Sequence, residues 1–321
     1  MKKKSTAVAF PTIPVVFVGG IRENRRPMYN TVGMAVTDEF ESIRTETTVE
    51  VRPKEYGINF LFEGKPLGGD RGRDILMAVK EFLKRADLDI GLHIESRNFS
   101  ISSGSSDAGM AALVAALNDA TQADMHLHDL AQIAMIGSES AIRSVYGGMN
   151  EIVVDPHPDL YGVQILSDKD LESIRLLAVT FNYPSRITAD EIHAAIRTHP
   201  WFRNRVEHVN HYWIPRIRAA AHNKDLKQLF ELAEENIRNA HYLLEEVGLR
   251  VRKKPIMNCW LDVEELRSQG LFAYCLQGGG NVVYIATLKE QLSQVQRELQ
   301  GKGWQSQICK VASGPKIVRS E

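Results

Sequence analysis

The stretch that most constrains the fold of this chain is NFSISSGSSDAGMAA, residues 98–112. It places serines and glycines between a strand-like segment and an apolar, helix-forming run, so we predict a helix over residues 108–118. Backbone N–H groups at a helix start lack partners within the helix and carry partial positive charge, which suits a bound phosphate. A capped helix start in a solvent-facing loop accounts for the same residues, and the stretch alone does not separate the two interpretations.

Around this stretch, strand-like and helix-like patterns follow one another without a regular alternation. Residues 7–20 predict a strand, a proline-marked turn and a buried strand that ends in glycines. Further strands are predicted over residues 30–37, 42–51, 58–62, 90–96, 151–154 and 174–181, and helices over residues 74–86, 127–138, 189–198, 206–221 and 226–247. Two strands, a helix and a strand follow within residues 272–311. This order favours an α+β fold over a doubly wound parallel sheet.

Composition and charge argue against several classes of protein. The chain has 39 Lys and Arg against 40 Asp and Glu, so nothing indicates a surface for nucleic acid or membrane. Its three cysteines are far apart without CxxC spacing, which argues against a disulfide framework and a zinc site and favours a reducing compartment. We find no signal peptide and no apolar run long enough to span a bilayer. A cytoplasmic protein is therefore predicted.

Histidines are the other candidates for metal ligands. The C-terminal half holds four of them close together in sequence: His193, His199, His208 and His211. Their spacing fits no zinc motif such as HExxH. We therefore expect these histidines at the surface or at an interface, with hydrogen-bond partners.

A second informative stretch is GSESAIRSVYGG, residues 137–148, in which Glu139 and Arg143 are four residues apart. On one helix face they would form a surface ion pair that contributes about 0.5 kcal/mol. Small residues surround both charges, however, which indicates a crowded and buried location. A third stretch, YCLQGGGNVVYIA at residues 274–286, places three glycines between two apolar strands. It predicts a loop that lies close to a ligand or to another backbone, although a hairpin turn is the simpler alternative.

Together and in this order, the three stretches resemble the GHMP kinase superfamily, and within it the mevalonate diphosphate decarboxylase branch. The resemblance extends over nearly the whole chain. It implies a two-lobed α+β fold, with a ribosomal-protein-S5-like N-terminal lobe over residues 1–180 and a ferredoxin-like C-terminal lobe over residues 181–321. It also implies ATP and Mg²⁺ as cofactors, and a homodimer.

Two departures from the decarboxylase pattern suggest the activity. The decarboxylases carry a lysine in the first strand, where FPTIPVVFVGG places Phe17, and an aspartate in the third stretch, where this chain has Gln277. Expulsion of a 3-phosphate and of carbon dioxide requires both charges, whereas phosphoryl transfer mainly requires positioning. With its SGSSDAG and SESAIRS segments, the chain resembles the archaeal mevalonate 3-kinase branch, which implies phosphorylation of the 3-hydroxyl of (R)-mevalonate without decarboxylation. A decarboxylase acting on a phosphorylated mevalonate and an inactive ligand-sensing homologue are the alternatives.

The resemblance also implies roles for individual residues. Arg143 would bind the mevalonate carboxylate through two hydrogen bonds, with Ser140 beside it in the substrate site. Glu139 would accept a hydrogen bond from a substrate hydroxyl and repel a 5-phosphate. Ser103 would contact substrate near the γ-phosphate of ATP.

The nucleotide phosphates would bind at the serine loop, at Ser102, Ser103, Gly104, Ser105, Ser106 and Asp107. Ser106 is the candidate ligand for Mg²⁺; for Asp107, an alternative role is a charge that stabilises the helix N-terminus. Phe17 and Gln277 would line the substrate site without acting as a base. Arg186 would reach substrate or phosphate, although a surface arginine after a proline turn accounts for it as well.

Overall fold

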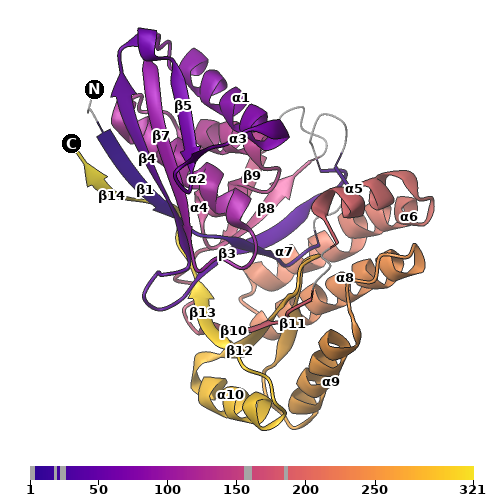
Figure 1. Ribbon diagram of the computed structural model, residues 1–321. Helices are drawn as coiled ribbons and strands as arrows, with labels where there is room; N and C mark the ends of the chain where they lie inside the picture. The colour runs from indigo at the N-terminus through magenta and orange to yellow at the C-terminus, as the bar shows by residue number, and fades with distance from the viewer. Residues whose placement is uncertain (1–3, 18–19, 22–26, 155–160, 184–186) are drawn as a thin grey trace.

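The computed structural model describes residues 4–17, 20–21, 27–154, 161–183 and 187–321 and contains two β-sheets flanked by helices (Figure 1). The chain ends close to where it begins, because the last strand pairs antiparallel with the first. Segments from both halves of the chain therefore build each sheet. The predicted α+β fold with two lobes is confirmed, whereas a division at residue 180 stays a prediction.

The first sheet has six strands, and all its neighbouring pairs are antiparallel except β5 and β7. In spatial order they are β14 (Lys316–Ser320), β1 (Lys4–Ala9), β4 (Arg44–Arg52), β7 (Gly91–Phe99), β5 (Ile58–Phe62) and β6 (Lys65–Pro66). Along most of β4, buried and half-buried residues alternate, as the predicted half-exposed strand requires. Helix α2 (Ser105–Thr121) packs on β1 and β4, and α1 (Gly69–Arg85) and α3 (Leu127–Gly137) pack beside it (Figure 1).

The second sheet combines strands from both halves of the chain. Its order is β11 (Tyr274–Leu276), β12 (Val282–Leu288), β10 (Ile174–Thr180), β13 (Gln307–Val311), β3 (Thr31–Thr37), β8 (Met149–Val153) and β9 (Tyr161–Leu166), with β2 (Thr12–Pro14) also paired to β3. Its helices are α4 (Ile142–Tyr146), α5 (Ala189–Thr198), α6 (Trp201–His208), α7 (Ile214–His222), α8 (Leu226–Glu246), α9 (Lys254–Ser268) and α10 (Leu292–Gly301). No helix in the described ranges is both long and apolar enough to cross a membrane.

Most predicted elements are confirmed within a few residues. Residues 15–17, predicted as part of a buried strand, form no strand, and α9 and β9 were not predicted. The helix predicted over residues 206–221 is divided by a π-helical turn, Val209–Trp213, just before Pro215, which has no N–H group to continue the helical hydrogen bonds. Strand β14 was not predicted because all five of its residues are exposed and it has no buried face. Only its pairing with β1 defines it.

Candidate active site

A cavity of about 250 Å³ lies between segments from both halves of the chain. The N-terminal half provides its wall from β2 and the residues after it, the serine loop, and the turn that leads into α4: Thr12, Ile13, Pro14, Phe17, Ser103, Gly104, Ser106, Asp107, Glu139, Ser140 and Arg143. The C-terminal half provides a residue just before α5, α5 itself, the glycine loop (residues 278–280) and β12: Ile187, Ile192, His193, Gly278, Gly279, Gly280, Val282 and Tyr284. The three stretches singled out from the sequence thus meet around one cavity.

The serine loop forms the first turn of α2. The helix begins at Ser105, three residues before the predicted start, so Ser105 and Ser106 belong to its first turn, where backbone N–H groups lack helical partners. Gly104 caps the helix with φ of 72°, and a Cβ atom there would lie 2.7 Å from the Thr12 carbonyl oxygen. Only glycine fits this position, which brings the helix start to the cavity wall. Ser102 is exposed and lies outside the lining residues.

Asp107 connects this helix start to two other segments. Its carboxylate accepts hydrogen bonds from Thr12, from Ser138 at 2.6 Å and from Ser140 at 2.9 and 2.8 Å. Burial raises the pKa of Asp107, while these hydroxyl donors and the Arg143 guanidinium act in the opposite direction. Both carboxylate oxygens are therefore engaged within the protein.

Arg143 is a buried cation on the cavity wall. It is 1% exposed, and its Nη2 donates to Thr31 Oγ1 at 2.6 Å, while Nε has no hydrogen-bond partner among the described residues. Burial lowers its pKa to about 10, so it stays charged at neutral pH. A Cβ atom at Gly33 would lie 2.6 Å from Arg143 Cδ, so the missing side chain makes room for the guanidinium. The predicted buried location is confirmed, and the surface ion pair is excluded.

Glu139 corrects one expectation from the sequence. It does not share a helix face with Arg143, because α3 ends at Gly137 and α4 begins at Ile142. The turn between the helices is held by Ser138 and Ser140, whose hydroxyls both donate to Asp107. Glu139 lies in this turn, half-buried on the cavity wall.

His193 is the clearest site residue that the sequence did not indicate. Its Nε2 lies 3.3 Å from Glu139 Oε1 and its side chain lines the cavity, so the expected surface or interface location is wrong for this histidine. His193 reaches the cavity because α5 packs across it, and no residue spacing in the sequence predicts that packing. Tyr284 was also missed, although it lies in the third stretch. Its Oη is 3.4 Å from Ser103 Oγ, and burial raises its pKa to about 12.

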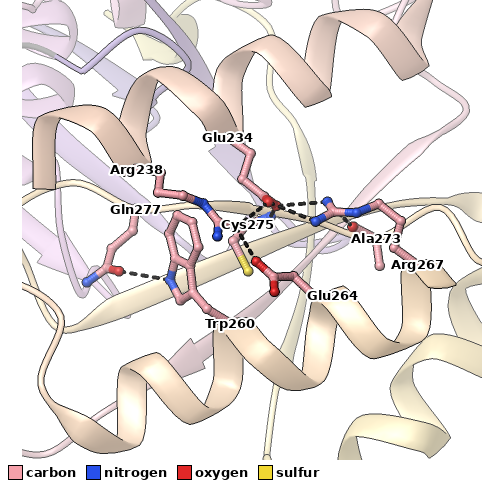
Figure 2. A network of polar contacts seen from close by, with 8 residues as sticks. All are labelled: Glu234, Arg238, Trp260, Glu264, Arg267, Ala273, Cys275 and Gln277. Carbon is pink, nitrogen blue, oxygen red and sulfur yellow. Dashed lines mark hydrogen bonds and ion pairs between the residues drawn. The ribbon is translucent and has the colours of Figure 1, made fainter. Parts of the chain in front are cut away.

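Phe17 and Gln277 have different positions relative to the cavity. Phe17 lines it and is 2% exposed; its N–H donates to Asn236 Oδ1 at 3.0 Å, and its carbonyl accepts from Tyr29 Oη at 2.9 Å. Gln277 is fully buried and lies behind the lining residues, where its Oε1 accepts from Trp260 Nε1 at 3.2 Å (Figure 2). Its Nε2 donates to the Gly280 carbonyl at 3.1 Å. Arg186 lies outside the described residues.

A second cavity, also of about 250 Å³, adjoins the first at Ser106, which lines both. Its wall is mainly apolar and includes Phe60, Phe62, Leu67, Ile75, Met110 and Leu113, with Ser105 at the helix start. An apolar cavity next to a helix N-terminus suits a flat ring system attached to phosphates. Across the described ranges, no three side chains of His, Cys, Asp or Glu gather as a metal site.

Comparison with known proteins agrees with this arrangement. Residues 9–157 match the family model of the diphosphomevalonate decarboxylase-like N-terminal domain, and residues 187–293 match that of the mevalonate-3-kinase C-terminal domain. The chain is 30% identical to mevalonate 3-kinase of Thermoplasma acidophilum over 88% of both chains. It is 28% identical to mevalonate-3-kinase of Picrophilus torridus over 97% of this chain and 96% of that protein. A crystal structure of the T. acidophilum enzyme superposes with a TM-score of 0.88 at 27% identity and covers 100% of both chains.

Proposed function

The chain belongs to the mevalonate 3-kinase family, and on this basis we propose that it transfers the γ-phosphoryl group of ATP to the 3-hydroxyl of (R)-mevalonate. The product is mevalonate 3-phosphate, and no decarboxylation follows. The T. acidophilum relative has been crystallised with mevalonate 3-phosphate and ADP bound, and with mevalonate bound. The resemblance inferred from the three stretches of sequence is thereby confirmed.

One observation carries the assignment: the first turn of α2 and the buried Arg143 line the same cavity. Phosphoryl transfer requires the phosphate donor and the acceptor hydroxyl to be held in line, with little covalent help from the protein. The helix start provides N–H donors for phosphate, and the guanidinium provides a site for a carboxylate. A small hydroxy acid held at Arg143 would thus lie beside a nucleotide held at α2.

The acceptor substrate is held by charge and by hydrogen bonds. Arg143 binds the mevalonate carboxylate, which supplies an anionic partner to a guanidinium that is already desolvated. Glu139 accepts a hydrogen bond from a substrate hydroxyl and disfavours a 5-phosphate by repulsion. Ser140 and Ser103 line the same wall, with Ser103 toward the phosphate loop.

The nucleotide extends from the first cavity into the second. Its phosphates bind the first turn of α2, and its base and ribose fill the apolar cavity that Ser106 joins to the substrate site. Mg²⁺ prefers oxygen ligands and is usually shared with substrate phosphates, so the Ser106 hydroxyl fits as its protein ligand. Asp107 does not fit this role, because both of its oxygens already accept hydroxyl donors. When bound, Mg²⁺ neutralises charge on the phosphates.

The reaction stops at phosphorylation because the two positions that carry charges in the decarboxylases are neutral here. Loss of the 3-phosphate with carbon dioxide needs charges that stabilise the leaving group and the positive centre at C3. The wall here offers the Phe17 ring, with the imidazole of His241 and the Gln277 amide behind it. Burial lowers the pKa of His241 to about 3, so this imidazole is uncharged at neutral pH.

Product analysis tests the proposal directly. The purified protein is incubated with Mg-ATP and (R)-mevalonate, ADP is measured with a coupled assay, and ³¹P NMR assigns the phosphorylated carbon. We expect one ADP per molecule of a tertiary phosphate ester, with no carbon dioxide. Release of carbon dioxide in step with ADP would favour the decarboxylase alternative. ATP binding without turnover on mevalonate or its phosphates would favour the ligand-sensing alternative.

The Glu139→Gln variant separates the substrate role from the nucleotide role. It keeps the shape of the side chain and removes its charge, so mevalonate turnover should fall while the dissociation constant for ATP stays unchanged. The variant should also discriminate less against mevalonate 5-phosphate, because the repelling charge is gone. An unaltered rate with mevalonate would contradict the role of Glu139.

A further inference from the structure

The glycine loop, residues 278–280, forms part of the cavity wall but has no side chains with which to hold its own shape. Glycine backbones have more conformational freedom than others, so an ordered loop of this composition needs external contacts. Two buried side chains provide them. His241 Nε2 lies 3.2 Å from the Gly278 carbonyl oxygen, and Gln277 Nε2 donates to the Gly280 carbonyl.

His241 comes from α8 and is completely buried. Since a carbonyl oxygen only accepts, the contact at Gly278 requires a proton on Nε2. Nδ1 has no hydrogen-bond partner among the described residues. Arg252 and Arg205 are the charged groups that act on this ring, and both oppose its protonation. The imidazole is therefore set up as a hydrogen-bond donor to the Gly278 carbonyl.

The same ring also supports Phe17 on the adjoining wall. The ring centroids of His241 and Phe17 are 5.4 Å apart with an interplanar angle of 86°, an edge-to-face contact. Asn236, also on α8, accepts the Phe17 backbone N–H. Helix α8 thus contacts both Phe17 and the glycine loop, and His241 is the side chain that touches the two together.

Gln277 completes this arrangement from the other side. Its Oε1 accepts from Trp260 of α9, and Trp260 in turn lies against His241 with ring centroids 6.2 Å apart. Figure 2 shows how α9 is held: Glu234 of α8 bonds to Arg267, and Arg238 of α8 pairs with Glu264. The Gln277 amide is matched to its partners, with its oxygen facing a donor and its nitrogen facing an acceptor. Gln277 therefore ties the glycine loop to α9 through two hydrogen bonds.

We propose that His241 is a positioning residue for phosphoryl transfer, which with Gln277 fixes the glycine loop and the Phe17 ring as one rigid wall behind the substrate. This inference rests on the proposed function. The wall sets where the acceptor hydroxyl lies relative to the phosphate at α2, and a misplacement of about 1 Å costs about 100-fold in rate. His241 acts through the loop and through Phe17, and it does not touch the substrate.

Two variants of His241 separate its functions, and a third serves as control. His241→Phe keeps a ring of similar size against Phe17 but has no donor for Gly278. His241→Gln keeps an N–H donor and loses the ring. His222→Phe makes the same exchange at an exposed position on α7. For each variant we would measure kcat and the KM values for mevalonate and ATP, together with hydrogen exchange of the amides of residues 278–281 in the absence of ligands.

We expect His241→Phe to lose about 10- to 100-fold in kcat, while both KM values stay within about threefold, because Arg143 and the helix start are intact. Exchange in the glycine loop should become faster. His241→Gln should restore the slow exchange and most of the rate, and His222→Phe should behave as the wild type does. Unchanged loop exchange in His241→Phe, an unchanged kcat, or equal damage in His241→Gln would overturn the inference. If the wild type did not turn over mevalonate, the proposed function would fail, and the exchange data alone would still decide the loop contact.

Discussion

Asp107 beside the cavity and Glu234 between α8 and α9 are both almost completely buried, but different groups compensate their charges. Glu234 accepts from Arg238, from Arg267 and from the Cys275 backbone N–H, with donor–acceptor distances of 2.7–3.1 Å (Figure 2). Among the described residues, Asp107 accepts side-chain hydrogen bonds only from hydroxyl groups, and the nearby Arg143 donates to Thr31 instead.

The difference separates a carboxylate that pairs with arginines from one that accepts hydrogen bonds from hydroxyls beside the cavity. At Glu234 the positive and negative charges satisfy each other, and the network joins two helices and a strand. At Asp107 the hydroxyls supply hydrogen bonds without supplying charge, and the Arg143 guanidinium donates to a neutral hydroxyl, as its proposed role in binding a substrate carboxylate requires. A site that binds a carboxylate needs a buried cation that the protein has not already neutralised with an ion pair.

The largest effect is expected from a substitution at Arg143, beside Asp107. Arg143→Ala removes the cation that is proposed to bind the substrate carboxylate, and kcat/KM for mevalonate should fall about 10³-fold. ATP affinity should be nearly unchanged, as measured by calorimetry, because the start of α2 is intact. Arg297→Ala, at an exposed position on α10, is the matched control. A rate within threefold of the wild type would refute the site.

Removing the carboxylate of Glu234 should reduce the stability of the protein and leave substrate binding largely unchanged. Glu234→Ala removes the shared partner of two arginines and a backbone N–H, although Arg238 keeps Glu264, so the free energy of unfolding should fall by about 3–5 kcal/mol. Urea denaturation at pH 7 measures this loss. The KM for mevalonate of the folded variant should change less than it does in Arg143→Ala. A stable Glu234→Ala variant with a large increase in the KM for mevalonate would contradict the structural role of Glu234.

A smaller effect is expected from a substitution at Gly33, which would move the Arg143 guanidinium without removing its charge. In Gly33→Ala the new Cβ atom would lie 2.6–2.8 Å from the guanidinium and its Cδ atom, so the side chain must shift. We expect kcat/KM for mevalonate to fall about 30-fold, within the usual cost of misplacing a binding group. Gly301→Ala, where nothing lies within 4 Å of an added Cβ atom, is the control. Equal behaviour of the two variants would argue against a confined guanidinium.

The smallest effect concerns the pH dependence at Asp107. Burial raises its pKa above the value in the unfolded chain, so its contribution to stability is complete below that unfolded value and is lost as pH rises through the folded one. Asp107→Asn removes this titration. Between pH 3.5 and 7, the stability of the variant relative to the wild type should therefore rise, by at most about 1.4 kcal/mol per pH unit. Urea denaturation across this range tests the sign, and a falling difference would contradict it.

Short-range patterns predicted much of this molecule. The serine loop at a helix start, the buried charge at Arg143 and the glycine loop each follow from local composition, and their order along the chain indicated the family. These features are local because helix starts, small residues around a charge and glycine runs restrict the backbone over a few residues. The proposed homodimer and the lobe boundary at residue 180 stay predictions.

What the sequence by itself determined is the inventory of the site: a serine loop at a helix start, an arginine among small residues, and two positions without charge. Only the tertiary structure decided how these groups are used. It placed Asp107 under three hydroxyl donors, brought His193 to Glu139, and set His241 between Phe17 and the glycine loop. Such contacts join residues that lie far apart in the sequence: Asp107 is 31 positions from Ser138 and 95 from Thr12. Burial and the identity of a long-range partner depend on how separate elements pack, so no local spacing encodes them.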